Sequence, residues 1–333
     1  KGNETGYLNQ WKSEFRKHFN STRLFNAHKA TYAERIDLLE SLKGIDQDWQ
    51  PSLKTVISAF KKDWEYRNTL TVEIVCAMLT DCLEYSITKS FTEKSSEKTV
   101  KKKLQEEYNR TIEKIEKATH QQIRKLFKHN IFNYDFPAQS ILHEDLFNEK
   151  TWQFLGLTPA QLITAAGLAG SAIGAAIDVA AAGLTFGIFT AIGGAVGAGW
   201  TALGGGKHLI TAKVLGMNLG GYQIKIGPIE NIQFLYVLLD RSLIFYSHII
   251  NWSHGYRDHH TVPAARISES IKSGFTAEWD DNAKKICTAF FMAIRSSNEV
   301  IKEESRKKLK AMLKDVLHKI SHSERKYGLI FKS

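Results

Sequence analysis

The chain has 333 residues, of which 43% are hydrophobic and 24% are charged. This length allows two or three domains with a sizeable core, and the composition excludes a disordered chain. The formal net charge of +10 favours an anionic partner. Because the sequence has no zinc-ligand spacing, RNP-like strand or recognition helix, nucleic acid is not the expected partner. Anionic lipid headgroups are the expected one.

Three cysteines are present, Cys76, Cys82 and Cys287, without a CxxC pair. An odd number of widely spaced cysteines predicts reduced thiols and a cytosolic compartment. The N-terminal stretch has no apolar signal-peptide core, and the chain is expected to be a fragment of a longer one.

Residues 1–45 are expected to form a helix, a strand and a helix. The stretch YLNQWKSEFRKHF has apolar residues at helical spacing, STRLFNAH is a short strand candidate, and TYAERIDLLESL follows as an amphipathic helix. Such a unit cannot bury itself alone. We therefore expect it to be the C-terminal edge of an incomplete α/β domain.

Residues 46–150 are expected to form a long helical arm. One helix is predicted from Asp48 to Ile87, and a second, densely charged helix from about Ser95 to His129. The second helix has one narrow apolar seam, made of Val100, Leu104, Tyr108, Ile112, Ile115 and Ile123. Such a seam is typical of antiparallel helix pairs with a solvated charged face. Residues 130–156 are expected to be an irregular connection.

Residues 151–207 contain the most unusual stretch of the chain. The 48 residues from Pro159 to Gly206 carry one charged side chain, Asp178, and twelve of the 23 glycines. Thr158 and Pro159 suit the start of a first helix, near 159–182, and a second helix is predicted near 185–203. The window is about twice the length that crosses a bilayer, which predicts a helical hairpin.

Small residues recur at every fourth position in both predicted helices, a packing pattern typical of membrane helices. Glycine also costs about 1 kcal/mol against alanine in a water-exposed helix. Asp178 faces either the partner helix or, near the hairpin tip, backbone donors and headgroups. The residues expected to form the membrane hairpin are Gly167, Gly170, Gly174, Asp178, Gly183, Gly187, Gly193, Gly197 and Trp200.

Residues 208–261 are expected to form a β-hairpin that turns at Gly220-Gly221, followed by an apolar helix capped by Asn231. Asp240 and Arg241 interrupt that helix, and an internal ion pair or a subunit contact would explain them. Residues 262–333 are expected to form C-terminal helices that are split near Ser296-Ser297. The predicted fold class is mainly α: a helical bundle with a long charged arm, a glycine-rich apolar hairpin and a small β-hairpin.

The motifs of common active sites are missing from the sequence. There is no G-x-x-x-x-G-K-[ST] loop, no GxGxxG, no G-x-S-x-G and no HExxH. The stretch SHGYRDHH has three histidines but no second ligand pair at metal-site spacing. The sequence therefore predicts no catalytic residue, no cofactor site and no metal site in this chain.

Four segments in a fixed order resemble an uncharacterised bacterial domain family that follows a Ras-like P-loop GTPase domain. They are QWKSEFRKHF; FNAHKATYAERIDLLESL with DWQPSL; IGAAIDVAAAGLTFGIFTAIGGAVGAG; and GPIENIQFLYVLLDRSLIFYSH with HGYRD. The resemblance spans about residues 7–260. It implies that the first segment ends a GTPase domain and that GTP and Mg²⁺ bind upstream, outside this chain. GTPase activity is expected only with such a domain.

The expected function is a membrane-anchoring effector domain of a bacterial GTP-binding protein. It would insert the glycine-rich hairpin at the cytoplasmic face of the inner membrane, permanently or when triggered. Two alternatives stay open at this point. One is a pore-forming or membrane-perturbing protein that stores its hairpin, and the other is a soluble scaffold whose hairpin joins a homo-oligomer.

Overall fold

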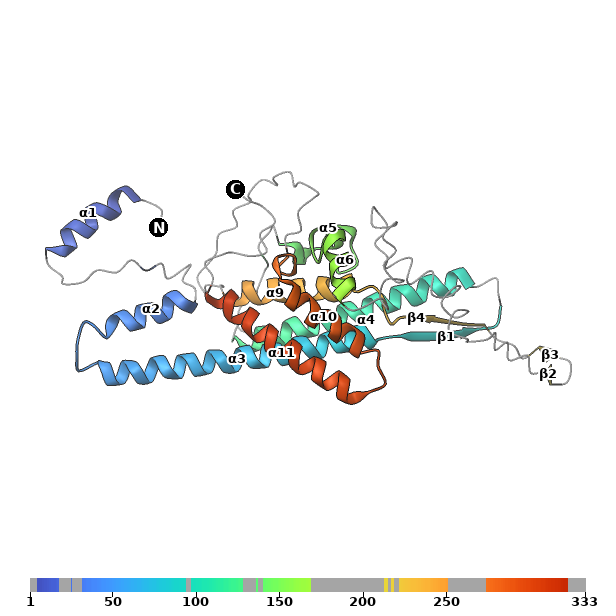
Figure 1. Cartoon of the computed structure of the whole chain (residues 1–333). Helices are drawn as coiled ribbons and strands as arrows, with labels where there is room; N and C mark the ends of the chain where they lie inside the picture. Colours follow the sequence, from blue (N-terminus) through green and yellow to red (C-terminus); the bar gives the residue numbers. More distant parts are fainter. Residues whose placement is uncertain are drawn as a thin grey trace.

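The computed structural model describes residues 5–17, 25, 32–93, 97–127, 136, 140–168, 213–214, 217–218, 222–250 and 274–322. These residues are mainly helical, which confirms the expected class (Figure 1). The helices before the glycine-rich stretch are α1 Thr5–Arg16, α2 Tyr32–Leu42, α3 Gln50–Glu84, α4 Glu97–Leu126, α5 Glu149–Phe154 and α6 Pro159–Leu168. Those after it are α9 Gln233–Ile250, α10 Asp281–Ala293 and α11 Glu299–His322. Two 3₁₀ turns, η2 Ile141–His143 and η5 Thr276–Glu278, complete the helical part.

The long helix α3 organises the bundle. It has 35 residues and carries Pro51 in its first turn, where a missing backbone N–H leaves no helical bond unmade. Its buried positions lie mainly in its second half, while α2 covers part of its first half (Figure 1). Helix α11 runs beside α3, and three ion pairs join the two helices: Lys302–Glu84, Lys310–Glu73 and Lys314–Glu65. The first half of α3 thus forms an arm with α2, and the second half belongs to the core.

Helix α4 confirms the predicted apolar seam. Leu104, Tyr108, Ile112 and Ile123 are buried against the core. Helix α4 packs along α3, as expected for an antiparallel pair, and also against α9 and the sheet. One buried residue, Glu116, is an acid that the seam does not include. The helix is therefore part of the core along its apolar side, and its charged side faces outward.

The sheet corrects the predicted β-hairpin. The strand β4, Tyr222–Ile226, pairs antiparallel with β1, Ile87–Phe91, so that Ile87 lies opposite Ile226. The expected pairing of β4 with the stretch just before Gly220-Gly221 is therefore wrong. That stretch forms its own short pair, β2 Lys213–Val214 with β3 Met217–Asn218. The expected extension of α3 to Ile87 is also wrong, because α3 ends at Glu84 and β1 follows.

Alternation of apolar and polar residues explains why β4 was found and its partner was not. In YQIKI, Ile224 and Ile226 are buried while Gln223 and Lys225 are exposed, which is the period of a half-buried strand. That period is local, but it does not say which other strand completes the ladder. The partner lies far away in sequence and reaches β4 only because α3 and α4 bring it there.

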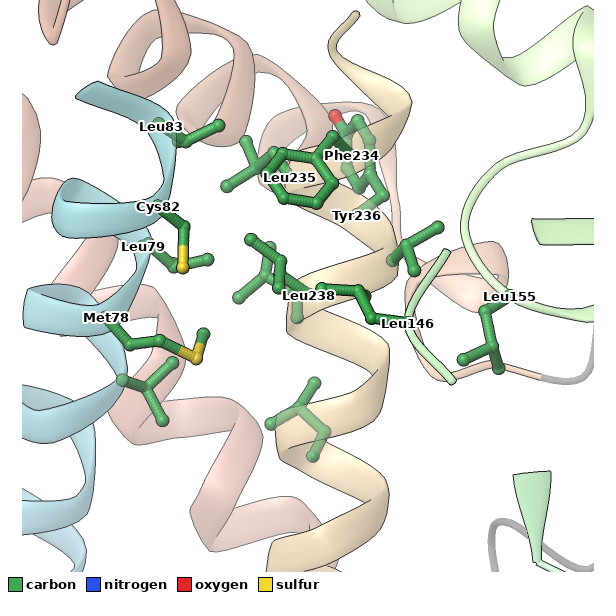
Figure 2. Packing of buried hydrophobic residues seen from close by; sticks show 14 of the residues in the cluster. Met78, Leu79, Cys82, Leu83, Leu146, Leu155, Phe234, Leu235, Tyr236 and Leu238 are labelled. Atoms are coloured by element: carbon green, nitrogen blue, oxygen red, sulfur yellow. The ribbon is translucent and has the colours of Figure 1, made fainter. Parts of the chain in front are cut away.

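Helix α9 is the centre of the core. All of its residues except His248 are buried. Its apolar side chains, among them Phe234, Leu235 and Leu238, pack against Met78, Leu79 and Cys82 of α3 (Figure 2). Asn231 caps the helix as expected, since its Oδ1 atom accepts the Gln233 N–H at 2.9 Å. Such burial on all sides explains why this helix is apolar around its circumference.

The C-terminal region follows the prediction. Helices α10 and α11 are separated at Ile294–Asn298, which contains the expected break at Ser296-Ser297. Asp280 caps α10 through a 2.8 Å bond from the Ala283 N–H to its Oδ1 atom. The three cysteines are free and buried, and burial raises the pKa of the Cys76 thiol to about 12. A thiol with so high a pKa stays protonated and behaves as an apolar group.

The predicted membrane hairpin lies mostly outside the described residues. Its first ten residues form α6, which confirms the expected helix start at Thr158 and Pro159. Residues 169–206, the predicted strand at 21–28 except Phe25, and the histidine-rich stretch at 253–260 are outside the described part. Within the described part, no helix combines the length and the apolar character needed to cross a bilayer.

Candidate functional site

The best-defined polar arrangement of the structure lies at the base of the glycine-rich stretch. Here the loop before α6 meets the start of α9 and the turn η5. Three side chains connect these segments, Asp240, Gln233 and Gln161, and we call their hydrogen bonds the root clamp. The loop is held by α9, and α6 is held in turn by η5 and α10.

Asp240 is the central acceptor of the root clamp. It is 0% exposed, although carboxylates are seldom fully buried. Its Oδ2 atom accepts the Gly156 N–H at 2.6 Å and the Thr276 hydroxyl at 2.9 Å. Its Oδ1 atom accepts the Thr276 N–H at 2.8 Å. Three donors on one carboxylate satisfy both oxygens and tie two distant loops to α9.

Gln233 holds the same loop from the first turn of α9. Its Oε1 atom accepts the Leu157 N–H at 3.0 Å, and its Nε2 atom donates to the carbonyls of Leu155 and Leu157. Between them, Gly156 has a φ of +78°, in the left-handed region that favours glycine. A Cβ atom at Gly156 would overlap the Gln233 amide. The loop can therefore close around this amide only with glycine at position 156.

Helix α6 starts directly after this loop. Thr158 and Gln161 form a reciprocal cap: the Gln161 N–H donates to Thr158 Oγ1, and the Thr158 N–H donates to Gln161 Oε1. The Gln161 Nε2 atom also donates to the Ala277 carbonyl at 2.7 Å. Further along, Ala165 is buried against α10. The first turns of the glycine-rich stretch are thus fastened to the protein core.

Arg241, the neighbour of Asp240, reaches another part of the core. Its guanidinium forms a two-pronged ion pair with Glu116 of α4, with Nη2 at 3.2 Å from Oε2, and donates to the Glu144 carbonyl at 2.9 Å. Burial opposes ionisation of Glu116, but the Arg241 guanidinium outweighs it, and the pKa of Glu116 is lowered. The pair confirms the expected internal ion pair. Asp240 and Arg241 do not pair with each other.

Two histidines adjoin this polar centre. His120 stacks on Phe245, with ring centroids 4.1 Å apart, and burial lowers its pKa to about 4. His248 lies 3.2 Å from the Ser140 hydroxyl, and burial lowers its pKa to about 4 as well. Both rings are therefore neutral at pH 7. They serve as packed side chains of α4 and α9.

A second hollow lies between α2, α3 and α11, with a volume of about 800 Å³. Its lining combines the rings of Tyr32 and Trp64, which stack at 4.2 Å, with charged groups of both signs. Glu40 forms ion pairs with Lys43 and Lys61 at its edge. Because the charges neutralise one another, the lining selects no particular class of ligand.

The sequence-predicted site residues fall largely outside this picture. Gly167 lies on α6 and is exposed, and among the described residues no atom lies within 4 Å of the place its Cβ would take. The other predicted hairpin residues, from Gly170 to Trp200, lie outside the described residues. Sequence reasoning missed Gln233 and Glu116. Asp240 was visible as a charge in an apolar helix, but its partners were not.

The arrangement positions segments and offers no reacting group. Both oxygens of Asp240 are occupied by donors, and Arg241 is bound to Glu116. Within the described ranges, no three histidine, cysteine or acidic side chains come together as metal ligands. The root clamp is therefore a device that fixes where the glycine-rich stretch leaves the core.

Comparison with known families gives one match. The model of a family described as a domain of unknown function (DUF3482) matches residues 13–318. The match covers nearly the whole chain, including all the residues of the root clamp. Comparisons with curated proteins and with solved structures gave no match.

Proposed function

The chain belongs to the family described as a domain of unknown function (DUF3482), and we propose that it anchors a protein to a membrane through its glycine-rich stretch. One observation carries this proposal. The core spends a fully buried carboxylate, Asp240, on fixing the loop from which the uncharged stretch starts. A stretch that only filled space would need no such fastening. A stretch that transmits force or position between a membrane and a domain would need it.

The solvent preference of residues 159–206 supports the same function. One charge in 48 residues, and a glycine or another small residue at every fourth position, suit a pair of closely packed helices among acyl chains. In this proposal α6 is the juxtamembrane part of the first helix. The cytoplasmic face of the inner membrane is the proposed location, since Lys207 and Lys213 follow the stretch.

The arm of α1, α2 and α3 is proposed to carry the domain that is anchored. Trp11 and Phe15 of α1 stack on each other at 5.2 Å and are exposed by 61% and 41%. On the first half of α3, Trp49, Val56 and Phe60 are also exposed. Clustered exposed aromatic residues mark surfaces that another protein covers. We propose an upstream GTP-binding domain as the covering partner, with GTP and Mg²⁺ bound there.

The function of an effector follows if nucleotide state moves this arm. Helix α3 connects the arm to α9, since Asn68 of α3 accepts the Tyr246 hydroxyl of α9 at 2.7 Å. Helix α9 in turn holds the root clamp. A shift of α3 would therefore act on the base of the glycine-rich stretch through packed and hydrogen-bonded elements.

Vesicle flotation at 0.5 M salt tests the anchoring. The full chain is expected to float with vesicles, and a Gly174→Lys, Gly187→Lys variant is expected to stay at the bottom. Two lysines near helix centres cost about 5–7 kcal/mol, which is more than a 1,000-fold loss of partitioning. A Ser52→Lys, Ala59→Lys variant adds the same charge at exposed positions of α3 and is expected to float.

Two results would speak against this function. Equal flotation of the glycine variant and the unchanged chain would show that the glycine-rich stretch does not insert. Rapid release of a trapped dye from the vesicles would favour the pore-forming alternative, because an anchor leaves the bilayer closed.

A further inference from the structure

The end of the molecule formed by β1, β4 and the first turns of α4 is a strongly basic tip. Phe91, the last residue of β1, lies opposite Tyr222, the first residue of β4, and α4 starts at Glu97 shortly after β1 (Figure 1). Six lysines belong to this tip, against two acids, Glu93 and Glu97. The lysines are Lys89, Lys98, Lys101, Lys102, Lys103 and Lys225.

The charges of the tip differ from those of the rest of the bundle. Lysines on α11 are used inside the fold, where Lys302, Lys310 and Lys314 pair with glutamates of α3. At the tip, Lys98, Lys102 and Lys103 are exposed and form no ion pair with any described residue. Beyond Leu104, α4 carries nearly equal numbers of acids and bases. The positive charge is therefore concentrated at one end of the helix.

The fold explains why these lysines stand together. The buried face of the sheet, with Ile224 and Ile226, packs toward α4, and the outward face carries Thr88, Ser90 and Lys225. Leu104 and Tyr108 fasten α4 to the core, so the charged first turns project beyond it. A basic outward surface with no apolar residues to bury suits contact with a charged, hydrated plane.

The position of the tip identifies the plane. Strand β4 receives the chain directly from the glycine-rich stretch and the short β2–β3 pair. If that stretch enters a bilayer, as proposed above, the point where the chain returns to the core lies at the bilayer surface. We propose that the lysines of this tip bind the anionic headgroups of the membrane into which the stretch inserts. This inference rests on the proposed anchoring function.

The expected strength follows from charge alone. One lysine near an anionic bilayer surface contributes about fivefold to membrane partitioning, so three contribute about 100-fold. The attraction is screened within about 10 Å at 0.1 M salt and much more at 0.5 M. Binding through the tip is therefore expected to be lost at high salt, whereas insertion of the glycine-rich stretch is not.

The test compares two variants of the full chain at 0.1 M salt. In the tip variant, Lys98, Lys102 and Lys103 are changed to Gln. In the control variant, three exposed lysines far from the tip, Lys62, Lys125 and Lys307, are changed to Gln. Both variants lose the same charge, and circular dichroism checks that both are folded. Partitioning is measured on phosphatidylcholine vesicles with and without 30% phosphatidylglycerol.

The tip variant is expected to partition about 100-fold less than the unchanged chain into the anionic vesicles and equally into the neutral ones. The control variant is expected to keep most of its binding. Equal losses in both variants would overturn the proposal, because they would reflect net charge alone. Binding of single-stranded RNA that the tip variant loses, with unchanged binding to vesicles, would overturn it in favour of an RNA surface.

A second comparison separates this inference from the anchoring itself. The Gly174→Lys, Gly187→Lys variant is expected to bind anionic vesicles at 0.1 M salt and to leave them at 0.5 M. Salt-resistant binding of the tip variant together with salt-sensitive binding of the glycine variant would support both proposals. Salt-sensitive binding that is the same in the tip and control variants would refute the tip alone. Loss of salt-resistant binding in the unchanged chain would refute the anchoring alone.

Discussion

The root clamp predicts a specific loss of stability when Asp240 is changed to Asn. The substitution keeps the size of the side chain but replaces one acceptor oxygen by an amide group. Three donors face the carboxylate, at 2.6 Å from Gly156 and at 2.8 and 2.9 Å from Thr276. The single oxygen of asparagine can accept two of them at most. At least one donor then meets the NH₂ group, which has no acceptor to offer.

The magnitude follows from burial. A hydrogen bond to a charged group contributes about 1.5–3 kcal/mol, and a buried donor without a partner costs about 1–3 kcal/mol. Since Asp240 is 0% exposed, solvent does not supply the missing acceptor. We expect Asp240→Asn to lower the free energy of unfolding by about 2–4 kcal/mol. Thr276→Val removes one of the three bonds and is expected to cost about 1–2 kcal/mol, whereas Thr276→Ser keeps the hydroxyl and costs less.

Two measurements check this reasoning. Urea unfolding followed by circular dichroism gives the change in free energy. Hydrogen exchange in the folded state shows where the structure has loosened, and faster exchange is expected in α6 and the loop before it than in α11. A loss below about 0.5 kcal/mol, or equal acceleration of exchange in α6 and α11, would refute the assignment of Asp240 as the fastener of α6.

Three further predictions concern other parts of the core. Glu116→Gln leaves the guanidinium of Arg241 buried without its charge partner and is expected to cost about 3–5 kcal/mol, while Glu116→Leu with Arg241→Met recovers most of this in urea unfolding; strictly additive losses would contradict a coupled pair. Burial lowers the pKa of His120 and His248 to about 4 from 6.5. The unfolded chain therefore binds more protons below pH 6.5, and the free energy of unfolding falls by up to about 2 kcal/mol per histidine between pH 6.5 and 5. Urea titrations should show a shallower fall after both are changed to Gln, and an unchanged slope would count against buried neutral rings. Gly227 has a φ of +80°, and a Cβ there would overlap the Tyr85 carbonyl. Gly227→Ala should cost about 1–3 kcal/mol in thermal unfolding, and an unchanged melting temperature would rule out this strain.

The proposals about membranes and GTP-binding domains are tested by the vesicle experiments above and stay predictions. The same holds for the division of the chain into five stretches and for the roles of the hairpin residues from Gly170 to Trp200. The family match confirms the expected relationship to an uncharacterised domain family over residues 13–318.

The sequence alone determined the positions of the helices, because helical periodicity is a property of neighbouring residues. The long apolar pattern after Asp48 became α3, the seam of the charged helix became the buried side of α4, and the break at Ser296-Ser297 separated α10 from α11. The start of α6 at Thr158 and the cap at Asn231 were also predicted, since both are formed within four residues of the chain.

Only the tertiary structure decided which distant residues meet. The pairing of β4 with β1, the partner of Arg241 on α4 and the three donors around Asp240 all join positions far apart in the chain. A strand's alternation or a charge in an apolar helix says that a partner is needed, because unpaired polar groups are costly to bury. It does not say which one. That choice depends on the way α3, α4 and α9 pack together, which no local pattern contains.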